Sequence, residues 1–375
     1  MIGEMVKVLF VACRHSPFDL NAGSGKDYDL HQALVSNGAD VRVVGPFDFK
    51  PNLAEHVIQK LHSILVKRRP AKYNTSFLKK SAAAVMQVIP EYKPDVIFSK
   101  YAGILCRLET DIPIVTLCDT TLFGSHSEWP MFTLLAYIQQ NSWERKAYRK
   151  ARAIITHSQW SADILTREYH QPASKISCFP VPASIPSSVI PKTITTRTLK
   201  PLKLLLVGRE YERKGIDIAI DVARLLNQSG VETQLRIVGF SGQDRDHVRF
   251  MGLYNKTIPE QLRAYVNNYQ WANFLIHPAR FEAAGIVPSE AAAFGTPTIT
   301  NNVGGLGTTV EDGVSGIVLP KNSSADAYVS ALKTAIGEQA AYDRLCETTR
   351  ERYERELNWE AAGRVFFETV KQALA

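Results

Sequence analysis

Two glutamates in the second half of the chain stand eight residues apart, in the segment 277–297, which reads HPARFEAAGIVPSEAAAFGTP. Glu282 and Glu290 would lie roughly on one face of a continuous helix at this spacing, but Pro288 stands between them. Proline is tolerated in the first turn of a helix and costs about 3 kcal/mol inside it. The sequence therefore predicts a helix that begins near Ile286, with Glu290 in its first turn and Glu282 on the preceding loop.

This geometry suits an anionic ligand that also carries hydroxyl groups. The free amides of residues 284–288, except that of the proline, and the helix dipole favour a phosphate. The two carboxylates would repel a phosphate, but they accept hydrogen bonds from hydroxyls. A nucleotide sugar has both kinds of group. The alternative is a buried, alanine-rich helix with two surface glutamates.

A second candidate site, formed by basic residues, lies in the segment VGREYERKGID. The expected strand 202–207 ends at Gly208, Arg209 follows at its carboxyl end, and Lys214 and Gly215 come where the next helix begins. Two permanent cations at a strand end and a helix start can neutralise a diphosphate leaving group. Either cation alone would be an ordinary surface charge.

The elements that position these residues alternate between strand and helix, which is typical of a doubly wound α/β fold. In the first half we expect strands at 7–13, 41–44, 94–99, 113–118 and 153–157, helices at 28–37 and within 52–92, and an exposed helix at 143–152. In the second half the alternation resumes with segments 202–207, 216–226, 234–238, 258–266, 274–276, 297–300 and 317–319, and helices follow at 328–336, 350–356 and 359–374.

A proline-rich stretch at 180–201 separates the two halves and predicts a linker. We expect an N-terminal Rossmann-like domain at 1–190, a linker at 191–201, and a C-terminal Rossmann-like domain at 202–356. Ligands of such sheets bind at the carboxyl ends of the strands. The two expected sites therefore define a cleft between the domains.

Composition limits the class of protein. With 375 residues, 45% hydrophobic and 22% charged, the chain resembles an ordinary soluble protein of two domains. Its five scattered cysteines contain no C-x-x-C pair, which argues against a disulfide framework or a zinc site and favours the cytoplasm. No signal peptide or membrane-spanning run is expected.

The net charge is +7, and residues 1–190 hold 22 basic and 16 acidic residues, a balance of +6. We expect the first domain to face an anionic partner, with the basic segment 52–92 as a membrane-contacting region or a solvated face. That segment includes the run from Lys67 to Arg69 and the pair Lys79 and Lys80.

The sequence lacks the motifs of several other classes of protein, namely triphosphate-binding proteins, nicotinamide enzymes and nucleic-acid-binding proteins. The run GSGKD lacks the first glycine and the Ser/Thr of a triphosphate-binding loop, and no G-x-G-x-x-G follows the first strand, as a nicotinamide enzyme would require. Nothing beyond net charge suggests nucleic-acid binding. The segment 244–246 resembles a metal-binding D-x-D only superficially and predicts a polar turn.

The motifs together resemble those of the retaining family-4 glycosyltransferases with the GT-B fold. The residues that carry the resemblance occur in the same order: Arg209 and Lys214-Gly215, RIVG at 236–239, VRFMG at 248–252, Glu282 and Glu290, Gly295 and Pro297, Gly304-Gly305, Asp312-Gly313 and Gly316. They cover almost the whole second half. The first half matches in layout, through the turn at 23–25 and the final helix from Trp359. The resemblance implies that this helix, at 359–375, crosses back and joins the first domain.

The resemblance implies a role for each position. Arg209 and Lys214 would hold the diphosphate of the donor, Glu290 the ribose hydroxyls, and Glu282 the hydroxyls of the transferred sugar. The donor would also contact Gly25 from the first domain and the backbone of Gly208, Gly239, Gly285, Ile286 and Val287. Phe240, Tyr254 and Asn255 would read the nucleobase. The resemblance further implies retention of the anomeric configuration, with the leaving phosphate as the base and no metal or other cofactor.

The chain departs from the family pattern on the acceptor side. Many relatives have His-Asp after the strand at 113–117, whereas this chain has Cys118 and Asp119. Asp119 keeps an acidic group facing the acceptor, and His157 is an acceptor-side residue or a structural histidine. Residues 283–285 (Ala-Ala-Gly) replace the usual Phe-Gly pattern, which implies a smaller sugar pocket. The glutamate often found after the double glycine is absent.

We therefore expect a hexosyltransferase that uses a nucleoside-diphosphate sugar and a glycan or lipid-linked acceptor of the cell envelope. Its location would be the cytoplasm or the inner face of the membrane. The alternatives are a GT-B sugar-nucleotide epimerase and a catalytically silent sugar-nucleotide-binding or scaffold protein, which the missing histidine makes credible.

Overall fold

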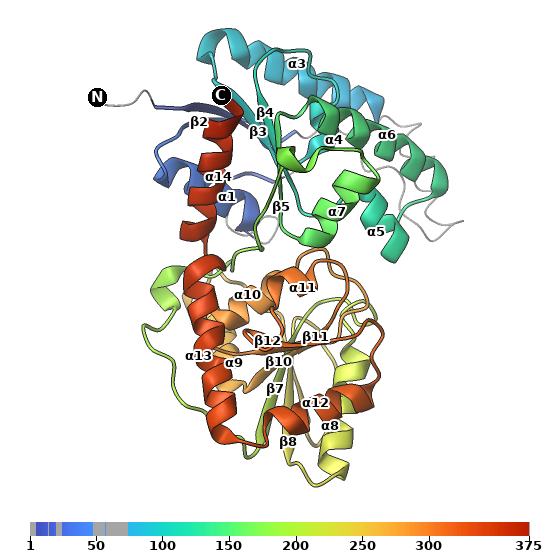
Figure 1. The fold of residues 1–375 in the computed structure, drawn as a ribbon, viewed down its shortest axis with the longest axis vertical. Coiled ribbons are helices and arrows are strands. Elements are labelled where there is room, and N and C mark those ends of the chain that lie inside the picture. The colour runs from blue at the N-terminus through green and yellow to red at the C-terminus, as the bar shows by residue number, and fades with distance from the viewer. Residues whose placement is uncertain (1–4, 14, 20–24, 48–56, 58–73, 375) are drawn as a thin grey trace. The chain divides into compact units, whose positions relative to one another are not determined.

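The computed structural model describes residues 5–13, 15–19, 25–47, 57 and 74–374. The chain forms two compact units, one of residues 1–179 with 362–375 and the other of residues 180–361 (Figure 1). Each unit is an α/β layer structure built on a parallel sheet, as the alternating pattern predicted.

The first unit has a sheet in the order β2-β1-β3-β4-β5-β6, in which all paired strands are parallel. Its strands are β1 (Lys7–Val11), β2 (Asp40–Val44), β3 (Val96–Ser99), β4 (Ile114–Cys118), β5 (Ala153–Thr156) and β6 (Ile176–Cys178). Its helices are α1 (Lys26–Ser36), α3 (Thr75–Tyr92), α4 (Ala102–Leu105), α5 (Leu122–Glu128), α6 (Leu134–Lys150), α7 (Gln159–Arg167) and most of α14 (Trp359–Leu374). A short 3-10 helix spans Ala173–Lys175.

The second unit repeats this plan with the order β12-β11-β10-β7-β8-β9, again all parallel. Its strands are β7 (Leu202–Val207), β8 (Thr233–Val238), β9 (Val248–Gly252), β10 (Phe274–His277), β11 (Thr298–Asn301) and β12 (Gly316–Leu319). Its helices are α8 (Ile216–Gln228), α9 (Pro259–Trp271), α10 (Ile286–Ala292), α11 (Leu306–Thr309), α12 (Ala325–Ala335) and α13 (Gln339–Glu356), and Ser187–Val189 form a 3-10 turn.

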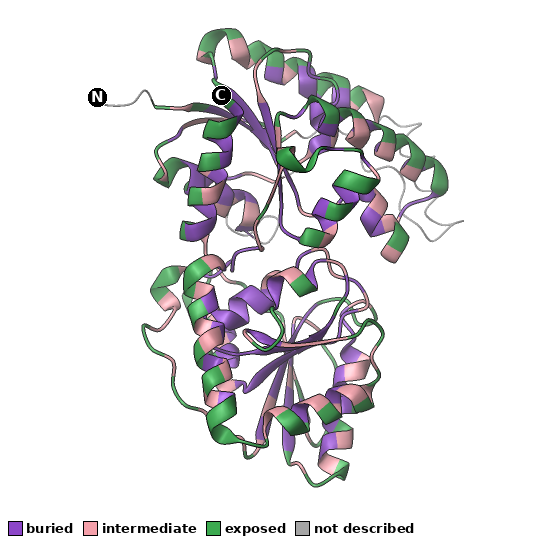
Figure 2. Cartoon of the chain, viewed as in Figure 1, coloured by how far each residue is buried: buried purple, intermediate pink, exposed green. Residues whose placement is uncertain are grey.

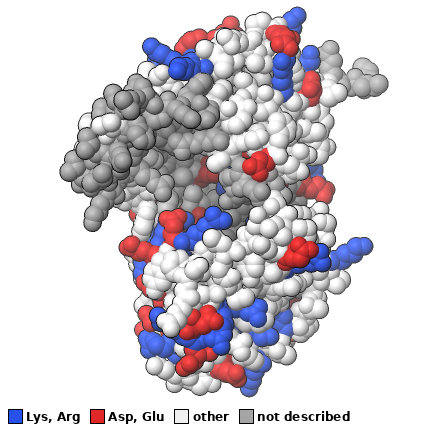
Figure 3. Space-filling view, turned by 180° about the vertical axis from the view of Figure 1, so that it is seen from behind, with Lys and Arg blue, Asp and Glu red and all other residues white. Residues whose placement is uncertain are grey.

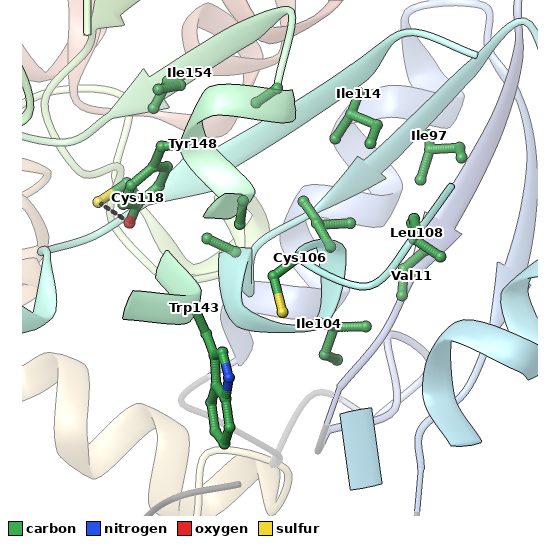
Figure 4. Packing of buried hydrophobic residues seen from close by; sticks show 14 of the residues in the cluster. Val11, Ile97, Ile104, Cys106, Leu108, Ile114, Cys118, Trp143, Tyr148 and Ile154 are labelled. Carbon is green, nitrogen blue, oxygen red and sulfur yellow. Dashed lines mark hydrogen bonds between the residues drawn. The ribbon is translucent and has the colours of Figure 1, made fainter. Parts of the chain in front are cut away.

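The inner strands β3, β4 and β10 are buried along their whole length, whereas the edge strands β2, β6, β9 and β12 are mostly half-exposed (Figure 2). In the first unit one hydrophobic cluster includes Val11, Ile97, Ile154 and Trp143 (Figure 4). In the second unit, helices α8, α12 and α13 pack on one cluster and helices α9 and α10 on another. The side chains at the carboxyl ends of the strands are therefore held by rigid elements.

Two expectations differ from the structure. The helix expected to be exposed at 143–152 is the second half of α6, and its Trp143, Ala147 and Tyr148 are buried, because a helix that covers a sheet must supply apolar residues every third or fourth position. The proline-rich stretch expected as a linker at 191–201 lies within the second unit, and the chain passes between the units at Phe179 and Pro180. Shortly after that point the backbone N–H of Ala183 donates to the carbonyl of Leu357, which ties the chain to the end of α13.

The charges on the second unit are mixed in sign on the face that Figure 3 shows. Residues 1–190 have a net charge of +6. Seven basic and three acidic residues of this part, which contribute +4 of that charge, lie outside the described residues. The expected basic run from Lys67 to Arg69 is among them. No helix in the described part of the chain is both long and apolar enough to cross a bilayer.

Candidate functional site

The loop after β7 places three cations at the carboxyl end of the second sheet. Arg209 is exposed, whereas Lys214 is 9% exposed and lies against the backbone of Gly208. A Cβ atom on Gly208 would stand 2.7 Å from Cγ of Lys214, so the glycine makes room for the lysine side chain. The third cation, Arg213, was missed in the sequence because nothing in its local pattern distinguishes it from a surface arginine.

Glu282, on the loop after β10, meets these cations. Its Oε2 atom accepts a hydrogen bond from Nζ of Lys214 and lies 3.4 Å from a terminal nitrogen of Arg213. Burial alone would raise the pKa of Glu282, but Lys214, His277 and Arg213 outweigh burial and hold this pKa well below its usual value. Glu282 is therefore an ionised carboxylate in a positively charged setting.

His277, the last residue of β10, is also part of this cluster. Its side chain is buried, and Nε2 lies 3.6 Å from Oε2 of Glu282. Burial lowers the pKa of His277, and the neighbouring Lys214 lowers it further. The imidazole is therefore neutral at pH 7, and its place could not be read from the sequence, where it only marks the end of an apolar strand.

A glycine pair from another strand fixes the backbone of Glu282. Gly304 has a φ of 52°, and a Cβ atom there would stand 1.9 Å from the carbonyl oxygen of Glu282. The N–H of Gly305 donates to the same oxygen at 3.1 Å. The double glycine noted in the sequence thus positions the candidate catalytic carboxylate.

The helix after Gly285 begins at Ile286, as predicted, and includes Val287 in its first turn. It has seven residues, so its dipole is small. Its first residues lie close to Glu282, because a Cβ atom on Gly285 would stand 3.5 Å from Cγ of that glutamate. The start of α10 and Glu282 are therefore neighbours.

Glu290 lies inside the second unit. It is 1% exposed, its Oε2 accepts hydrogen bonds from the hydroxyls of Tyr265 and Tyr269 at 2.6 and 2.7 Å, and its Oε1 accepts one from Nζ of Lys256 at 2.6 Å. The alternative of two surface glutamates is therefore wrong for Glu290. Burial and then Glu290 raise the pKa of Tyr265 well above 10, and the charge of Arg209 opposes them, which places Arg209 within electrostatic reach of this cluster.

Gly239 and the residues expected to read the nucleobase follow β8 and β9. The N–H of Gly239 donates to the carbonyl of Gly252 at 2.7 Å. The ring of Phe240 lies 5.4 Å from that of Tyr211, and the ring of Tyr254 lies 6.1 Å from that of Tyr265.

The side chain of Asn255 is used within its own loop, where its Oδ1 accepts hydrogen bonds from the backbone N–H and the hydroxyl of Thr257. Asp244 likewise accepts a hydrogen bond from the N–H of Phe250, as expected of a polar turn. The described residues contain no group of three or more His, Cys, Asp or Glu arranged to hold a metal ion.

In the first unit, Asp119 and His157 come together at the ends of β4 and β5. Nε2 of His157 lies 3.5 Å from Oδ1 of Asp119, and Oδ2 of Asp119 lies 3.3 Å from Nζ of Lys26. Burial would raise the pKa of Asp119, but Lys26, His157 and Lys100 together hold it well below its usual value. Sequence reasoning missed Lys26 and Lys100 because nothing in their local pattern distinguishes them from surface lysines.

His157 is wholly buried, and its Nδ1 lies 3.0 Å from the carbonyl oxygen of Phe179. A carbonyl only accepts, so Nδ1 carries the proton that makes this hydrogen bond. Burial lowers the pKa of His157 to about 4, an effect that Asp119 partly offsets.

Two further residues named in the sequence analysis, Cys118 and Gly25, have different surroundings. Cys118 points into the core, where its sulfur accepts a hydrogen bond from the hydroxyl of Tyr148 at 3.1 Å (Figure 4). Gly25 has a φ of 79° and precedes α1, while residues 20–24 of its turn lie outside the described residues. The expected contact between Gly25 and the donor stays a prediction.

Two family models match the chain. The model described as Glycosyltransferase Family 4 matches residues 28–182, and the model described as Glycosyl transferases group 1 matches residues 192–352. A glycogen synthase of Mycobacterium tuberculosis (strain ATCC 25618 / H37Rv) is 28% identical over 288 residues, which are 72% of this chain and 66% of that protein. The glycogen synthase of Thermus caldophilus is 27% identical over 187 residues, which are 47% of this chain and 40% of that protein. The chain thus spans just under two thirds of the length of the first of these curated relatives and less of the second.

Solved structures match over almost the whole chain. Sucrose-phosphate synthase from Thermosynechococcus elongatus superposes with a TM-score of 0.69 at 20% identity and covers 98% of both chains. The Anabaena protein HepE, in complex with UDP and glucose, superposes with a TM-score of 0.63 at 18% identity, covering 98% of this chain and 99% of that one. These likenesses show the GT-B fold. The two family models, which between them match residues 28–182 and 192–352, show that the chain belongs to the family-4, group 1 glycosyltransferases.

Proposed function

We propose that this protein is a retaining hexosyltransferase that takes the sugar from a nucleoside-diphosphate donor and passes it to a glycan or lipid-linked acceptor. The observation that carries the proposal is the contact between Lys214, Arg213 and Glu282 at the carboxyl end of the second sheet. A carboxylate held ionised among cations accepts hydrogen bonds from sugar hydroxyls, while the cations bind the adjacent diphosphate.

In the proposed mechanism, Arg209, Arg213 and Lys214 stabilise the charge that develops on the diphosphate as the bond from the anomeric carbon to the phosphate oxygen breaks. The acceptor oxygen forms its bond to that carbon on the same face. Its proton passes to the leaving phosphate oxygen, so the products are the glycoside and the protonated nucleoside diphosphate. Glu282 orients the sugar, and the backbone at Gly208, Gly239 and Gly285 to Val287 contacts the donor, with Gly25 supplied by the first unit.

Asp119 is proposed to hold an acceptor hydroxyl, with His157 behind it. The pairing of Asp119 with Lys26 supports this role, because it keeps the carboxylate ionised and in place. We further propose that no metal takes part, that the protein works in the cytoplasm or at the inner face of the membrane in cell-envelope synthesis, and that the basic first unit contacts anionic lipid.

The test is a panel of UDP-, GDP- and ADP-hexoses incubated with the purified protein, with and without a mixed glycan acceptor, while release of nucleoside diphosphate is measured. We expect release by the wild type, also after treatment with EDTA, and a loss of roughly 100-fold in Glu282→Gln. Binding of the nucleoside diphosphate to this variant should stay within about threefold, because the diphosphate cations remain.

Glu338→Gln is the matched control, since Glu338 is exposed and its side chain does not cap α13. Unchanged turnover in Glu282→Gln would contradict the proposed role of this carboxylate. Binding without any release would favour the catalytically silent alternative. NMR of the product tests retention separately, and an inverted anomeric centre would contradict it.

A further inference from the structure

Arg352, on α13, is a buried arginine that holds both ends of one loop of the second unit. The residue is 4% exposed. One terminal nitrogen donates to the hydroxyl of Ser315 at 2.7 Å, and the other donates to the carbonyl oxygen of Thr308 at 2.6 Å. Thr308 belongs to α11, and Ser315 directly precedes β12. The rigid fork of the guanidinium therefore fixes the segment 308–315 to α13.

The charge of Arg352 is balanced by neighbouring carboxylates. Its Nε donates to Oε1 of Glu356 at 2.7 Å and lies 3.5 Å from Oε2 of Glu311. A buried arginine that is paired with acids in this way holds parts of the protein together, because its charge is already satisfied. Arg352 is therefore a structural contact of α11 and has no surface with which to bind a diphosphate.

The other side of α11 holds the backbone at Glu282. The hydroxyl of Thr309, a buried residue, donates to the carbonyl oxygen of Ala284. The N–H of Gly305 donates to the carbonyl oxygen of Glu282 at 3.1 Å. Two backbone positions of the loop that carries the candidate catalytic carboxylate are thus bound to α11 and to the residue before it.

The short helix α11 needs support from other elements. It has four residues, Leu306–Thr309, and a single helical turn is not stable without tertiary contacts. Arg352 donates to the carbonyl of Thr308 at the C-terminal end of this turn, where a helix leaves carbonyl groups without partners and favours a cation. The neighbouring residue, Thr309, is the one that binds Ala284. A continuous path of hydrogen bonds and one helical turn therefore leads from Arg352 to the Glu282 loop.

We propose that Arg352 is a positioning residue for the transfer reaction. Through α11 it holds the backbone from Glu282 to Ala284, and it thereby sets where the Glu282 carboxylate meets the transferred sugar. This inference rests on the proposed function. A small misplacement of a reacting or orienting group lowers the rate more than it lowers the affinity, because the rate depends on alignment. The cations that bind the diphosphate lie on a different loop, after β7.

The experiment compares wild type and Arg352→Met, which keeps the length of the side chain and removes its donors. The substrate is whichever of the UDP-, GDP- and ADP-hexoses the wild type turns over fastest, and release of nucleoside diphosphate gives kcat and KM. Circular dichroism sets a temperature at which both proteins are folded. We expect kcat to fall roughly tenfold or more, while the affinity for the nucleoside diphosphate, measured by calorimetry, stays within about threefold.

Arg197→Met is the matched control. Arg197 also donates to several backbone carbonyls, those of Gln270, Phe294 and Gly295. These carbonyls precede β10 and β11, at the edge of the sheet opposite to the candidate site. Arg197→Met should therefore lose stability but keep its kcat while folded. Hydrogen exchange should become faster in the peptide 281–287 of Arg352→Met and stay unchanged in that peptide of Arg197→Met.

Thr309→Val tests the next contact along the path. The substitution keeps the size of the side chain and removes the hydroxyl that donates to Ala284, so it should lower kcat in the same direction as Arg352→Met. The double variant, Arg352→Met with Thr309→Val, should lose no more than the larger of the two single losses, because both residues act through α11.

A kcat within about twofold of wild type in folded Arg352→Met would overturn the inference. An equal fall of kcat in Arg197→Met, or fully additive losses in the double variant, would overturn it as well. If Arg352→Met does not fold, Thr309→Val decides, and an unchanged kcat in that variant counts against the inference. Absence of release by the wild type with every donor would instead contradict the proposed function, and hydrogen exchange would still show whether Arg352 holds the Glu282 loop.

Discussion

Glu282 and Glu290 are the same residue type at a helix-like spacing, yet the tertiary structure gives them different surroundings. Glu282 lies on a loop among Lys214, Arg213 and a neutral His277, with its side chain 14% exposed. Glu290 is enclosed by two tyrosines and a lysine. A carboxylate with exposed surface can exchange partners with a ligand, whereas an enclosed one holds its neighbours in place.

The buried imidazole of His157 predicts a pH dependence of stability. Its pKa in the folded protein is about 4, below the usual 6.5, so the unfolded chain binds more protons between these values. The contribution of His157 to stability is therefore fully present above about pH 6.5 and is lost as the pH falls through about 4, by on the order of 3 kcal/mol in total.

Urea unfolding at pH 7.5 and pH 5 measures this effect. In His157→Gln the amide can still donate to the carbonyl of Phe179, but it does not titrate, so the loss between the two pH values should be smaller than in the wild type. His170→Asn, at an exposed position with a left-handed backbone, is the control and should behave like the wild type. An equal loss in His157→Gln would show that other groups cause it.

At the scale of elements, the loops after the strands of the second sheet depend on one another. The loop after β11 supplies Gly304 and Gly305, which hold the carbonyl of Glu282 on the loop after β10. The parallel arrangement brings these loops to one edge, since all strands of the sheet end on the same side.

Gly304→Ala should therefore affect the site as well as stability. Its Cβ would collide with the backbone of Glu282, and we expect a loss of at least about 2 kcal/mol in stability together with a loss of transfer activity. Gly313→Ala is a matched control, because Gly313 also has a positive φ, of 72°, but a Cβ there meets nothing within 4 Å. It should lose only about 1 kcal/mol and keep its activity. Activity retained in Gly304→Ala would contradict the role given to this glycine.

At the scale of the whole molecule, the end of the chain belongs to the unit that contains its beginning. Residues 362–375 of α14 are part of the first unit, where the buried Phe366 lies 6.0 Å from the ring of His157 and 6.2 Å from that of Phe179. The final helix thus supports the end of β5, next to Asp119.

Phe366→Ala should destabilise the first unit by about 3–5 kcal/mol, because it leaves a cavity beside β5. Hydrogen exchange should show lower protection of peptides from β4 and β5 and unchanged protection of peptides from β7 and β10. Phe367→Ala, at the adjacent and half-buried position, should have a smaller effect. Equal losses of protection in both units would contradict the division of the chain.

Much of the fold could be predicted from the sequence, because short apolar runs alternate with amphipathic segments and each pattern is local. The two parallel sheets and the helix start at Ile286 follow from such patterns, whereas the return of the C-terminal helix to the first unit was implied by the resemblance to the family. The family was also identified from the order of the motifs, because Arg209, Lys214, Glu282, Glu290 and Gly304 recur in a fixed sequence.

Only the tertiary structure decided which side chains meet. The pairs Lys214 with Glu282, Lys256 with Glu290, and Lys26 with Asp119 join residues that lie 68, 34 and 93 positions apart in the chain. No local pattern distinguishes Lys26 and Lys256 from solvated lysines, and for Lys214 the sequence indicated a site cation but not its partner. Burial and the choice of partner arise when distant strands end at one edge of a sheet. The sequence alone therefore determined the elements and the family, and the packing of the sheets determined the charges that surround each candidate site residue.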